Sequence, residues 1–528
     1  MEPSRKWHIY VIFTLIFALE LAVGYYLAAV YGFMSGDATS RVANAFYVLY
    51  SREPGLANIG FVWNPLMSFL EMIVLLFHPL YPLLASAGLA AVLVSGLFAA
   101  LTVAHLVKAG QLFGLHTGIS VAFALLYAFN PYIFYYGANG LTEAVFIYFI
   151  NVTVIQILIW MRDSNQARPL VTAAVALALA FWSRYETVFF GAAIAFGVLI
   201  WIIQSSRDPL KERFREVEAT WTVLLTPVVF SGLLWIFLNY SIQGDALYFL
   251  RSSYSNFGQA ELLKGDEKLT TLINNPVAVF FYVIERLWYF AIPLLVITVL
   301  RVIERRIYEW DFLLLVLIAM SIPAMQYILL IRGGTAAWVR YYMYALPIVT
   351  VWIPYEISRM RFRRMGTAAL LVAMIASAVA GGFLMNNHAI ASDEYEAFRK
   401  LDLYEEQHAG KAAAAYINAY LPDQTILTDS FSGFIVILSS DHPKNFIITA
   451  DKEYMNALEN SAQSPVRIDY VMVPNPNSVD KFKLDSINVK YPRLYDEGAD
   501  WAVLHKEFGG YWKIFKVIRD DAGASSPR

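Results

Sequence analysis

Three residues near the N-terminus have the types and spacing that catalysis requires. Asp37, Arg41 and Asn44 stand at i, i+4 and i+7, so they share one face of a helix predicted from Gly36 to about Ser51. A carboxylate beside a cation stays ionised and could take a proton from a hydroxyl group. The structural alternative is that Asp37 caps the helix and pairs with Arg41, which contributes about 1 kcal/mol to stability.

The opposite face of this predicted helix is apolar, as in a helix that lies on a bilayer surface. Its apolar residues are Val42, Phe46, Leu49 and Tyr50. A second, very apolar helix is predicted from Pro65 to about Phe77, with Asn64 as its N-cap. Capping alone is enough to explain Asn64.

A further set of polar residues lies in loops between later apolar runs. Glu143 begins one of these runs, where negative charge suits a helix N-terminus, and its carboxylate is, after Asp37, the second candidate catalytic residue. The planar guanidinium group of arginine can bind two phosphate oxygens at once. The structural alternative for each arginine is that its side chain extends to the lipid headgroups. The candidate ligand-binding residues of this set are Asn64, Asn139, Arg184, Glu186, Arg332, Arg340 and Tyr341.

Other kinds of chemistry lack residues to perform them. The sequence has no cysteine, its eight histidines show no metal-ligand spacing, and it has neither a Walker loop nor a dinucleotide fingerprint. ATP hydrolysis and zinc-protease chemistry are therefore excluded. Asp37 and Glu143 could together hold a divalent metal ion if the fold brings them close.

The polar loops separate apolar segments that the composition assigns to a membrane. Hydrophobic residues make up 58% of the chain and charged residues 16%, against about 45–50% and about 25% in soluble proteins. A net charge of −2 argues against a nucleic-acid partner. About eleven runs could cross the hydrocarbon: Ile9 to Met34, Leu83 to Val107, Phe113 to Phe129, Glu143 to Met161, Leu170 to Trp182, Thr187 to Ile203, Trp221 to Asn239, Val277 to Leu300, Phe312 to Ile331, Tyr341 to Ile357 and Thr367 to Met385.

Positive charge predicts the orientation of these runs. Lys and Arg concentrate in alternate connections, which are expected to face the cytoplasm together with the N-terminus. These residues include Arg5, Lys6, Lys108, Arg162, Arg301 and Arg361. The segment from Leu170 to Ile203 is predicted to be a hairpin that turns at Ser183–Glu186, because a single span would leave Arg184 and Glu186 in mid-membrane.

A different composition begins at residue 388. Residues 388–528 combine charged residues, turn signals and short β-branched runs, and they predict a soluble α/β domain on the extracytoplasmic side, after a membrane domain of residues 1–387. The predicted strands are Thr425 to Thr428, Phe434 to Leu438, Phe446 to Thr449, Tyr470 to Val473 and Trp512 to Val517. Helices are predicted near Glu394 to Tyr420 and Lys452 to Asn460.

With these motifs the chain resembles the GT-C superfamily of multi-pass glycosyltransferases, which includes protein O-mannosyltransferases, the lipid A aminoarabinose transferase and core galacturonosyl transferases. The resemblance covers roughly residues 1–385 and rests on the order and spacing of short motifs. They are Gly36–Arg41, Trp63–Leu66, where relatives often have a His-Pro-Pro-Leu-like segment, Asn139–Glu143 and Ser183–Glu186.

The resemblance implies an inverting transfer of a sugar from a polyprenyl phosphate at the outer leaflet of a prokaryotic plasma membrane. Asp37 would be the base, and Arg340, Arg332 or Arg184 would neutralise the phosphate. The expected partners are this donor, a lipid, glycan or protein acceptor, and membrane lipid. Two departures matter: Ala38 follows Asp37 where many relatives have a second acid, and the Trp-Trp-Asp signature of oligosaccharyltransferases is absent. Transfer of a whole oligosaccharide to asparagine is therefore not expected.

Two other classes of protein remain open at this point. A secondary transporter would explain the spans and Glu20 within the first run, but it predicts repeated halves that the sequence lacks. A non-catalytic protein of envelope assembly would explain the C-terminal domain, but it gives no purpose to the polar face of Asp37, Arg41 and Asn44.

Overall fold

A computed structural model describes residues 7–205, 207–255, 258, 267–336, 338–399, 403–459 and 461–519. Arg5 and Lys6, and parts of the helices predicted near 394–420 and 452–460, lie outside the described residues. The chain forms two compact units. The helical unit comprises residues 1–24, 61–67 and 92–398, and the mixed unit comprises residues 25–60, 68–91 and 399–528. Whether residues 388–528 fold by themselves stays a prediction.

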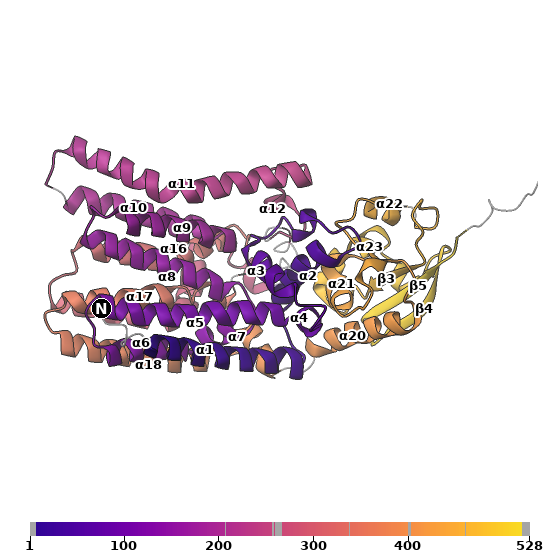
Figure 1. The fold of residues 1–528 in the computed structure, drawn as a ribbon, viewed down its shortest axis with the longest axis horizontal. Coiled ribbons are helices and arrows are strands. Elements are labelled where there is room, and N and C mark those ends of the chain that lie inside the picture. Colours follow the sequence, from indigo (N-terminus) through magenta and orange to yellow (C-terminus); the bar gives the residue numbers. More distant parts are fainter. Residues whose placement is uncertain are drawn as a thin grey trace, which may run out of the picture. The chain divides into compact units, whose positions relative to one another are not determined.

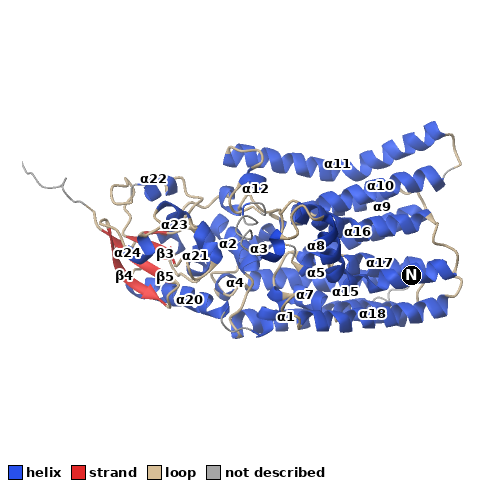
Figure 2. Ribbon diagram, turned by 180° about the vertical axis from the view of Figure 1, so that it is seen from behind, coloured by secondary structure: helices blue, strands red, loops and turns tan. Residues whose placement is uncertain are grey.

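The helical unit is a set of long helices that run side by side (Figures 1 and 2). They are α1 (Trp7–Tyr25), α5 (Leu89–Leu112), α6 (Thr117–Ala128), α7 (Pro131–Ala138), α8 (Glu143–Arg162), α9 (Ala167–Ser183), α10 (Thr187–Ser205), α11 (Leu210–Gln243), α15 (Pro276–Ile303), α16 (Trp310–Ile331), α17 (Ala345–Arg359) and α18 (Arg363–Met385), with the shorter α12 (Tyr248–Arg251), α14 (Glu267–Thr270) and α19 (Ser392–Arg399).

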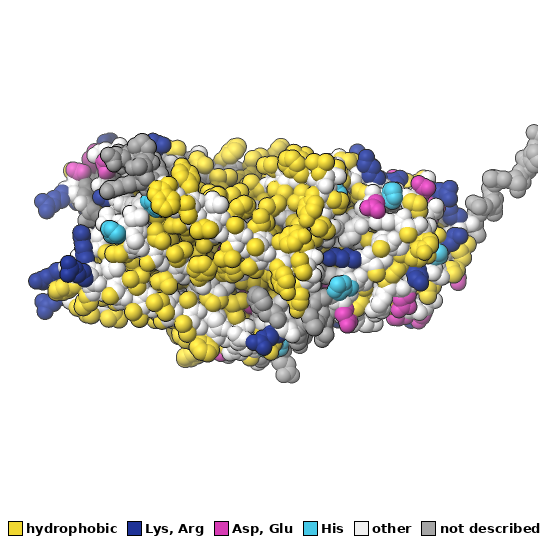
Figure 3. Space-filling view, turned by 60° about the horizontal axis from the view of Figure 1, so that its bottom comes forward, with side chains coloured by type: hydrophobic (Ala, Val, Ile, Leu, Met, Phe, Trp, Pro, Cys, Tyr) yellow, Lys and Arg dark blue, Asp and Glu magenta, His cyan; other side chains and the backbone are white. Residues whose placement is uncertain are grey.

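The protein is an integral membrane protein. Eight of the described helices are long and apolar enough to cross a membrane, or nine if α6 and α7, which are bent by 71° at their junction, form one broken span. Each of the eleven predicted runs contains a helix, but α9 and α17 have only 17 and 15 residues. Figure 3 shows hydrophobic side chains covering the flank of the helical unit, with Lys and Arg gathered at its left end.

The predicted hairpin between Leu170 and Ile203 is confirmed. α9 ends at Ser183, α10 begins at Thr187, and Arg184, whose backbone is extended, caps α9. The turn thus holds its charged residues at the ends of two helices rather than inside a helix. α9 packs on α8 and α11, and α10 packs on α16.

Charged residues from distant segments meet at the opposite end of the helices from this turn. The Arg162 guanidinium lies over the Phe113 ring, 5.4 Å from its centre, and Phe113 in turn contacts Tyr355. Tyr355 donates a hydrogen bond of 3.0 Å to Asp311, which pairs with the fully buried Arg301 at 2.8 Å. Several loops that are rich in positive charge therefore share one end, as expected if they all face the cytoplasm.

The mixed unit contains a five-stranded sheet in the order β2-β1-β3-β5-β4. The strands are β1 (Ile426–Leu427), β2 (Phe446–Ile447), β3 (Tyr470–Pro474), β4 (Ala502–Phe508) and β5 (Trp512–Val517). β1 pairs in parallel with β2 and β3, whereas β5 is antiparallel to β3 and β4. Its helices are α2 (Gly36–Tyr50), α4 (Leu83–Ser86), α20 (Leu403–Tyr420), α21 (Ser430–Leu438), α22 (Tyr454–Glu459), α23 (Ser486–Lys490) and α24 (Leu494–Glu497), with most of α3 (Leu66–Leu75).

Two predictions about this α/β part need correction. Phe434 to Leu438 form the end of helix α21, not a strand, because the Asp429 carboxylate accepts a hydrogen bond from Phe431 N at 2.8 Å and starts the helix. Both faces of α21 are buried, so its apolar run resembles that of a strand. Strand β4 was not predicted, because the five residues between Ala502 and Phe508 are exposed and show no alternation.

Candidate functional site

A buried ion cluster forms where α8 begins and where α9 turns into α10. Arg184 Nη1 lies 2.7 Å from Glu143 Oε1, and Arg184 Nη2 lies 2.8 Å from Glu186 Oε1. The Glu143 side chain is 0% exposed and the Arg184 side chain 13%. Burial opposes the charge of Arg184, but the Glu186 and Glu143 carboxylates outweigh it and raise the pKa of Arg184 above its ordinary value.

Arg340 joins this cluster from the other half of the helical unit. It lies in the short 3₁₀ helix Val339–Tyr341 before α17, with its Nε 3.6 Å from Glu143 Oε1. Its guanidinium lies over the Trp338 ring, 4.5 Å from the ring centre. Tyr341 touches both arginines, since its ring centre is 5.5 Å from the Arg184 guanidinium and 5.7 Å from that of Arg340. Segments almost 200 residues apart in sequence thus share one site.

The cluster contains two arginines and two glutamates. Among the described residues, Glu143 Oε2 has no hydrogen-bond partner. Burying a carboxylate oxygen without a hydrogen-bond donor costs free energy. A ligand that donates a hydrogen bond to Glu143 Oε2 would remove this cost. Thr142 supports the arrangement, because its hydroxyl oxygen accepts a hydrogen bond of 2.9 Å from Arg184 Nη1.

Asn139 shapes the loop that leads into the cluster. It follows α7, and its side-chain oxygen accepts a hydrogen bond of 3.0 Å from Leu141 N. Gly140 adopts a φ of 78°, which favours glycine, and donates its N–H to Ser95 Oγ at 3.2 Å. The loop is therefore fixed on both sides just before Glu143.

Glu394 is a neighbour of this site that the sequence analysis did not identify. It lies in the first turn of α19, is 2% exposed, and accepts a hydrogen bond of 2.7 Å from the Tyr136 hydroxyl. Burial, with help from the Asp393 charge, raises the pKa of Glu394 to about 7, although Arg340 acts in the opposite direction. The sequence signal was the pair Asp393-Glu394 directly after the last span, but its partner lies 258 residues away.

Two of the predicted ligand-binding residues, Asn64 and Arg332, lie in other segments of the helical unit. Asn64 donates its amide to Phe181 O at 2.6 Å, and nearby the Tyr185 hydroxyl donates to Val62 O at 2.9 Å. Asn64 thus ties its segment to α9. Arg332 is exposed at the end of α16, and the described residues offer it no ion pair with the cluster.

The predicted catalytic face lies on α2, in the mixed unit. Asp37 is in the first turn of α2 and is exposed, while Val42 and Phe46 on the other face are fully buried. Ser35, not Asp37, occupies the N-cap position. Arg41 and Asn44 are half-buried. The predicted amphipathic helix is confirmed, whereas a cavity shared by Asp37 and Glu143 stays a prediction.

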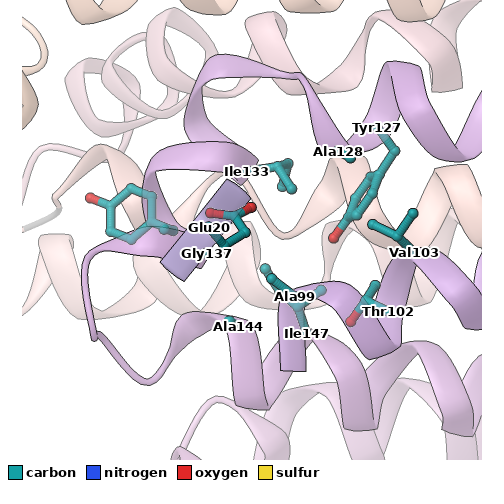
Figure 4. A pocket seen from close by; sticks show the side chains of 11 residues that line it. Glu20, Ala99, Thr102, Val103, Tyr127, Ala128, Ile133, Gly137, Ala144 and Ile147 are labelled. Atoms are coloured by element: carbon teal, nitrogen blue, oxygen red, sulfur yellow. The ribbon is translucent and has the colours of Figure 1, made fainter. Parts of the chain in front are cut away.

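Glu20 belongs to a different feature inside the helical unit. It lies in α1, is 1% exposed, and its Oε2 has no hydrogen-bond partner among the described residues. Figure 4 shows its carboxylate against Gly137 in a small cavity that Tyr127 and Thr102 also line. A Cβ on Gly137 would lie 2.6 Å from Glu20 Oε1, so the glycine is what lets the carboxylate approach α7.

Within the described ranges, no group of three His, Asp or Glu side chains could hold a metal ion. Glu143 Oε1 is engaged by Arg184. A divalent metal ion between Asp37 and Glu143 therefore stays a proposal.

Neither a model of a known protein family nor a curated protein matches the sequence. Among solved structures, ArnT from Cupriavidus metallidurans bound to undecaprenyl phosphate aligns with 98% of this chain and 99% of its own, with a TM-score of 0.54 and 10% identity. ArnT is a lipid A aminoarabinose transferase of the GT-C superfamily. The chain has the GT-C fold. ArnT from the same organism in the apo state aligns with 95% of this chain and 97% of its own, with a TM-score of 0.50 and 11% identity. The resemblance drawn from the motifs is thus confirmed for the fold, and it extends beyond residue 385 to nearly the whole chain.

Proposed function

We propose that the protein is an inverting glycosyltransferase that moves a sugar from a polyprenyl phosphate to an acceptor hydroxyl. The observation that carries the proposal is the buried cluster of Arg184 and Arg340 around Glu143, because fixed arginines suit a lipid phosphate and the membrane donor needs no nucleotide loop. The GT-C fold, and an ArnT structure that contains undecaprenyl phosphate, support it.

In the proposed reaction Asp37 accepts the proton of the acceptor hydroxyl, and the hydroxyl oxygen attacks the anomeric carbon. The bond from that carbon to the phosphate oxygen breaks, and its electron pair stays on the phosphate. Arg340 and Arg184 offset the growing negative charge. Arg41 and Asn44 on the helix of Asp37 bind substrate beside it, with Asn139, Glu186 and Tyr341 holding the arginine side of the site.

The proposed orientation places the N-terminus in the cytoplasm of a prokaryotic cell and residues 388–528 outside. A reporter fused after Met385 should be active only in the extracytoplasmic compartment. Cytoplasmic activity of this fusion would contradict the mechanism, because the donor would then be presented on the wrong side.

The decisive experiment measures release of free polyprenyl phosphate by purified protein in lipid nanodiscs, with polyprenyl-phosphate sugars as donors and lipid, glycan and protein acceptors. Asp37→Asn is the test variant, since Asn keeps the size and shape of Asp but cannot act as a base. We expect it to slow release about 10²–10⁴-fold. Equal release by Asp37→Asn would remove Asp37 from the mechanism, and substrate movement across liposomes without bond cleavage would favour a transporter. Loss of release with EDTA would support the metal ion.

A further inference from the structure

Helix α2, which carries Asp37, packs within the mixed unit on the C-terminal part of the chain. It contacts α21, and it also packs on the 3₁₀ helix Leu56–Ile59 and on α4. Ala38, Val42 and Phe46 on α2 are all 0% exposed. A helix that only rested on a bilayer would leave such a face to lipid. Protein contacts therefore hold α2, and α21, which follows the last span, supplies part of them.

These contacts hold α2 before its start and in its last turn. Gln407 of α20 donates its amide to Met34 O at 2.8 Å, just ahead of the helix. Tyr47, in the last turn of α2, is 3% exposed. α2 packs on α21, and burial, followed by the charge of Asp429 at the start of α21, raises the pKa of the Tyr47 hydroxyl.

A third contact holds the chain directly after α2. Arg52 Nε lies 2.8 Å from Glu453 Oε1, and Glu53 Oε2 accepts a hydrogen bond of 3.3 Å from Lys452 N. Both partners belong to the loop that leads into α22. Together the three contacts fix the residues before α2, its last turn and the residues after it.

The third contact contains more carboxylates than positively charged groups. Asp451 beside it is 4% exposed, and burial raises the pKa of Asp451 to about 6, with further upward shifts from Glu53 and Glu453 and a downward shift from Arg52. Arg52 thus faces three carboxylates. Without Arg52, the three carboxylates would repel one another. Without Glu453, the charge of Arg52 would still be compensated by the carboxylates of Glu53 and Asp451.

The Arg52–Glu453 pair is better suited to positioning than to stabilising. Their side chains are 32% and 23% exposed, and ion pairs that contact water contribute about 0–1 kcal/mol. A catalytic group displaced by about 1 Å, by contrast, can lose about 10²-fold in rate. The effect of this pair should therefore appear in turnover rather than in the free energy of unfolding.

We propose that the C-terminal part of the chain positions Asp37 through α2, with Arg52 and Glu453 as positioning residues. The proposal rests on the proposed function, since it assumes that Asp37 is the base. It assigns to residues 399–528 a part in the reaction itself.

The test uses full-length protein and the release assay with Arg52→Glu, Glu453→Arg and the double variant that exchanges the two charges. Each single variant should lower kcat by about tenfold or more while the KM for donor stays close to that of wild type. The double variant should recover most of the rate. Arg52→Ala should be slower than Glu453→Ala, because of the acid excess.

The matched control is the exchange of Arg493 and Glu497, an exposed pair in α24 whose side chains are 81% and 64% exposed. This exchange should leave kcat unchanged. If a single reversal lowers the unfolding temperature, the milder Arg52→Gln and Glu453→Gln replace it, with the same expectation.

Wild-type rates in the single variants, or a double variant that folds but stays slow, would overturn the positioning role. Those outcomes leave the proposed function intact. A wild-type protein that releases no polyprenyl phosphate from any donor would instead overturn the proposed function.

Discussion

Arg184 Nη1 lies 2.7 Å from Glu143 Oε1, so a three-residue turn between two membrane helices is joined to the first residue of a third. Glu143 starts α8 and Arg184 ends α9, and 41 residues separate them in sequence. This ion pair locks the relative height of α8, α9 and α10 at the end of the bundle where the proposed donor phosphate binds.

Loss of Arg184 should destabilise the protein. Arg184→Gln leaves the buried Glu143 without its closest cation, and breaking one side of a buried pair costs about 3–5 kcal/mol. The unfolding temperature of purified protein in detergent should fall clearly. Arg184→Gln combined with Glu143→Gln should recover part of the loss, because the buried Glu143 carboxylate that lost its closest cation is then removed as well. An unchanged unfolding temperature in Arg184→Gln would show that Glu143 is neutralised some other way.

Arg340 should determine how well the donor is used. Arg340→Lys keeps the charge but loses the planar fork, so it should raise the KM for donor, and Arg340→Ala should raise it further. Arg332→Ala is the control, because Arg332 is exposed and makes no ion pair with the cluster among the described residues. Acceptor KM should stay constant in all three variants. A normal donor KM in Arg340→Ala would move the phosphate to Arg184 or elsewhere.

Glu394 should make stability depend on pH. Burial raises the pKa of Glu394 to about 7, so the folded protein binds this proton more tightly than the unfolded chain, whose Glu pKa is about 4.3. Protonated Glu394 therefore stabilises the folded protein fully below about pH 4.3, and this stabilisation is lost as the pH rises to about 7. The loss amounts to roughly 1.4 kcal/mol for each unit by which the folded and unfolded pKa values differ. The unfolding temperature of wild type should fall relative to that of Glu394→Gln across this window. Parallel curves for the two proteins would contradict the prediction.

Gly24 should be essential for the packing of α1. A Cβ at this position would lie 2.4 Å from Ala138 O and 2.3 Å from Val92 Cγ1. Gly24→Ala should therefore cost about 1–3 kcal/mol of stability, although alanine favours a helix over glycine. Gly232→Ala in α11 is the control, because its Cβ would meet its nearest neighbour, Phe181 Cζ, at 3.9 Å. Equal unfolding temperatures for the two variants would mean that α1 can shift to accept the methyl group.

Much of the fold could be predicted because the membrane simplifies the problem. Long apolar runs give helices, and the cost of charge in lipid placed the turn at Arg184 and Glu186. The same reasoning could not detect α21, since the cap from Asp429 outweighs the strand propensity of its apolar run. It also missed β4, whose exposed residues show no pattern.

The site was only partly predictable for a related reason. Glu143, Arg184, Glu186 and Arg340 were selected for charge near span ends, and the structure brings them together. Asn64 and Glu394 depend on partners 117 and 258 residues away. Without those partners the sequence could show neither that Asn64 is used for structure nor that Glu394 is held beside Tyr136.

The pairing of two arginines with two glutamates in the cluster should affect how strongly the product inhibits the reaction. A guanidinium that is already paired with a carboxylate attracts a phosphate less than an unpaired one, because the carboxylate cancels part of its field. If the lipid phosphate binds there, Glu143 and Glu186 compete with it for Arg184 and Arg340 throughout the cycle. The spent carrier, which has one more negative charge than the donor, is then held less tightly than bare arginines would hold it. Retention of the carrier is limited by the same carboxylates that keep the arginines in place.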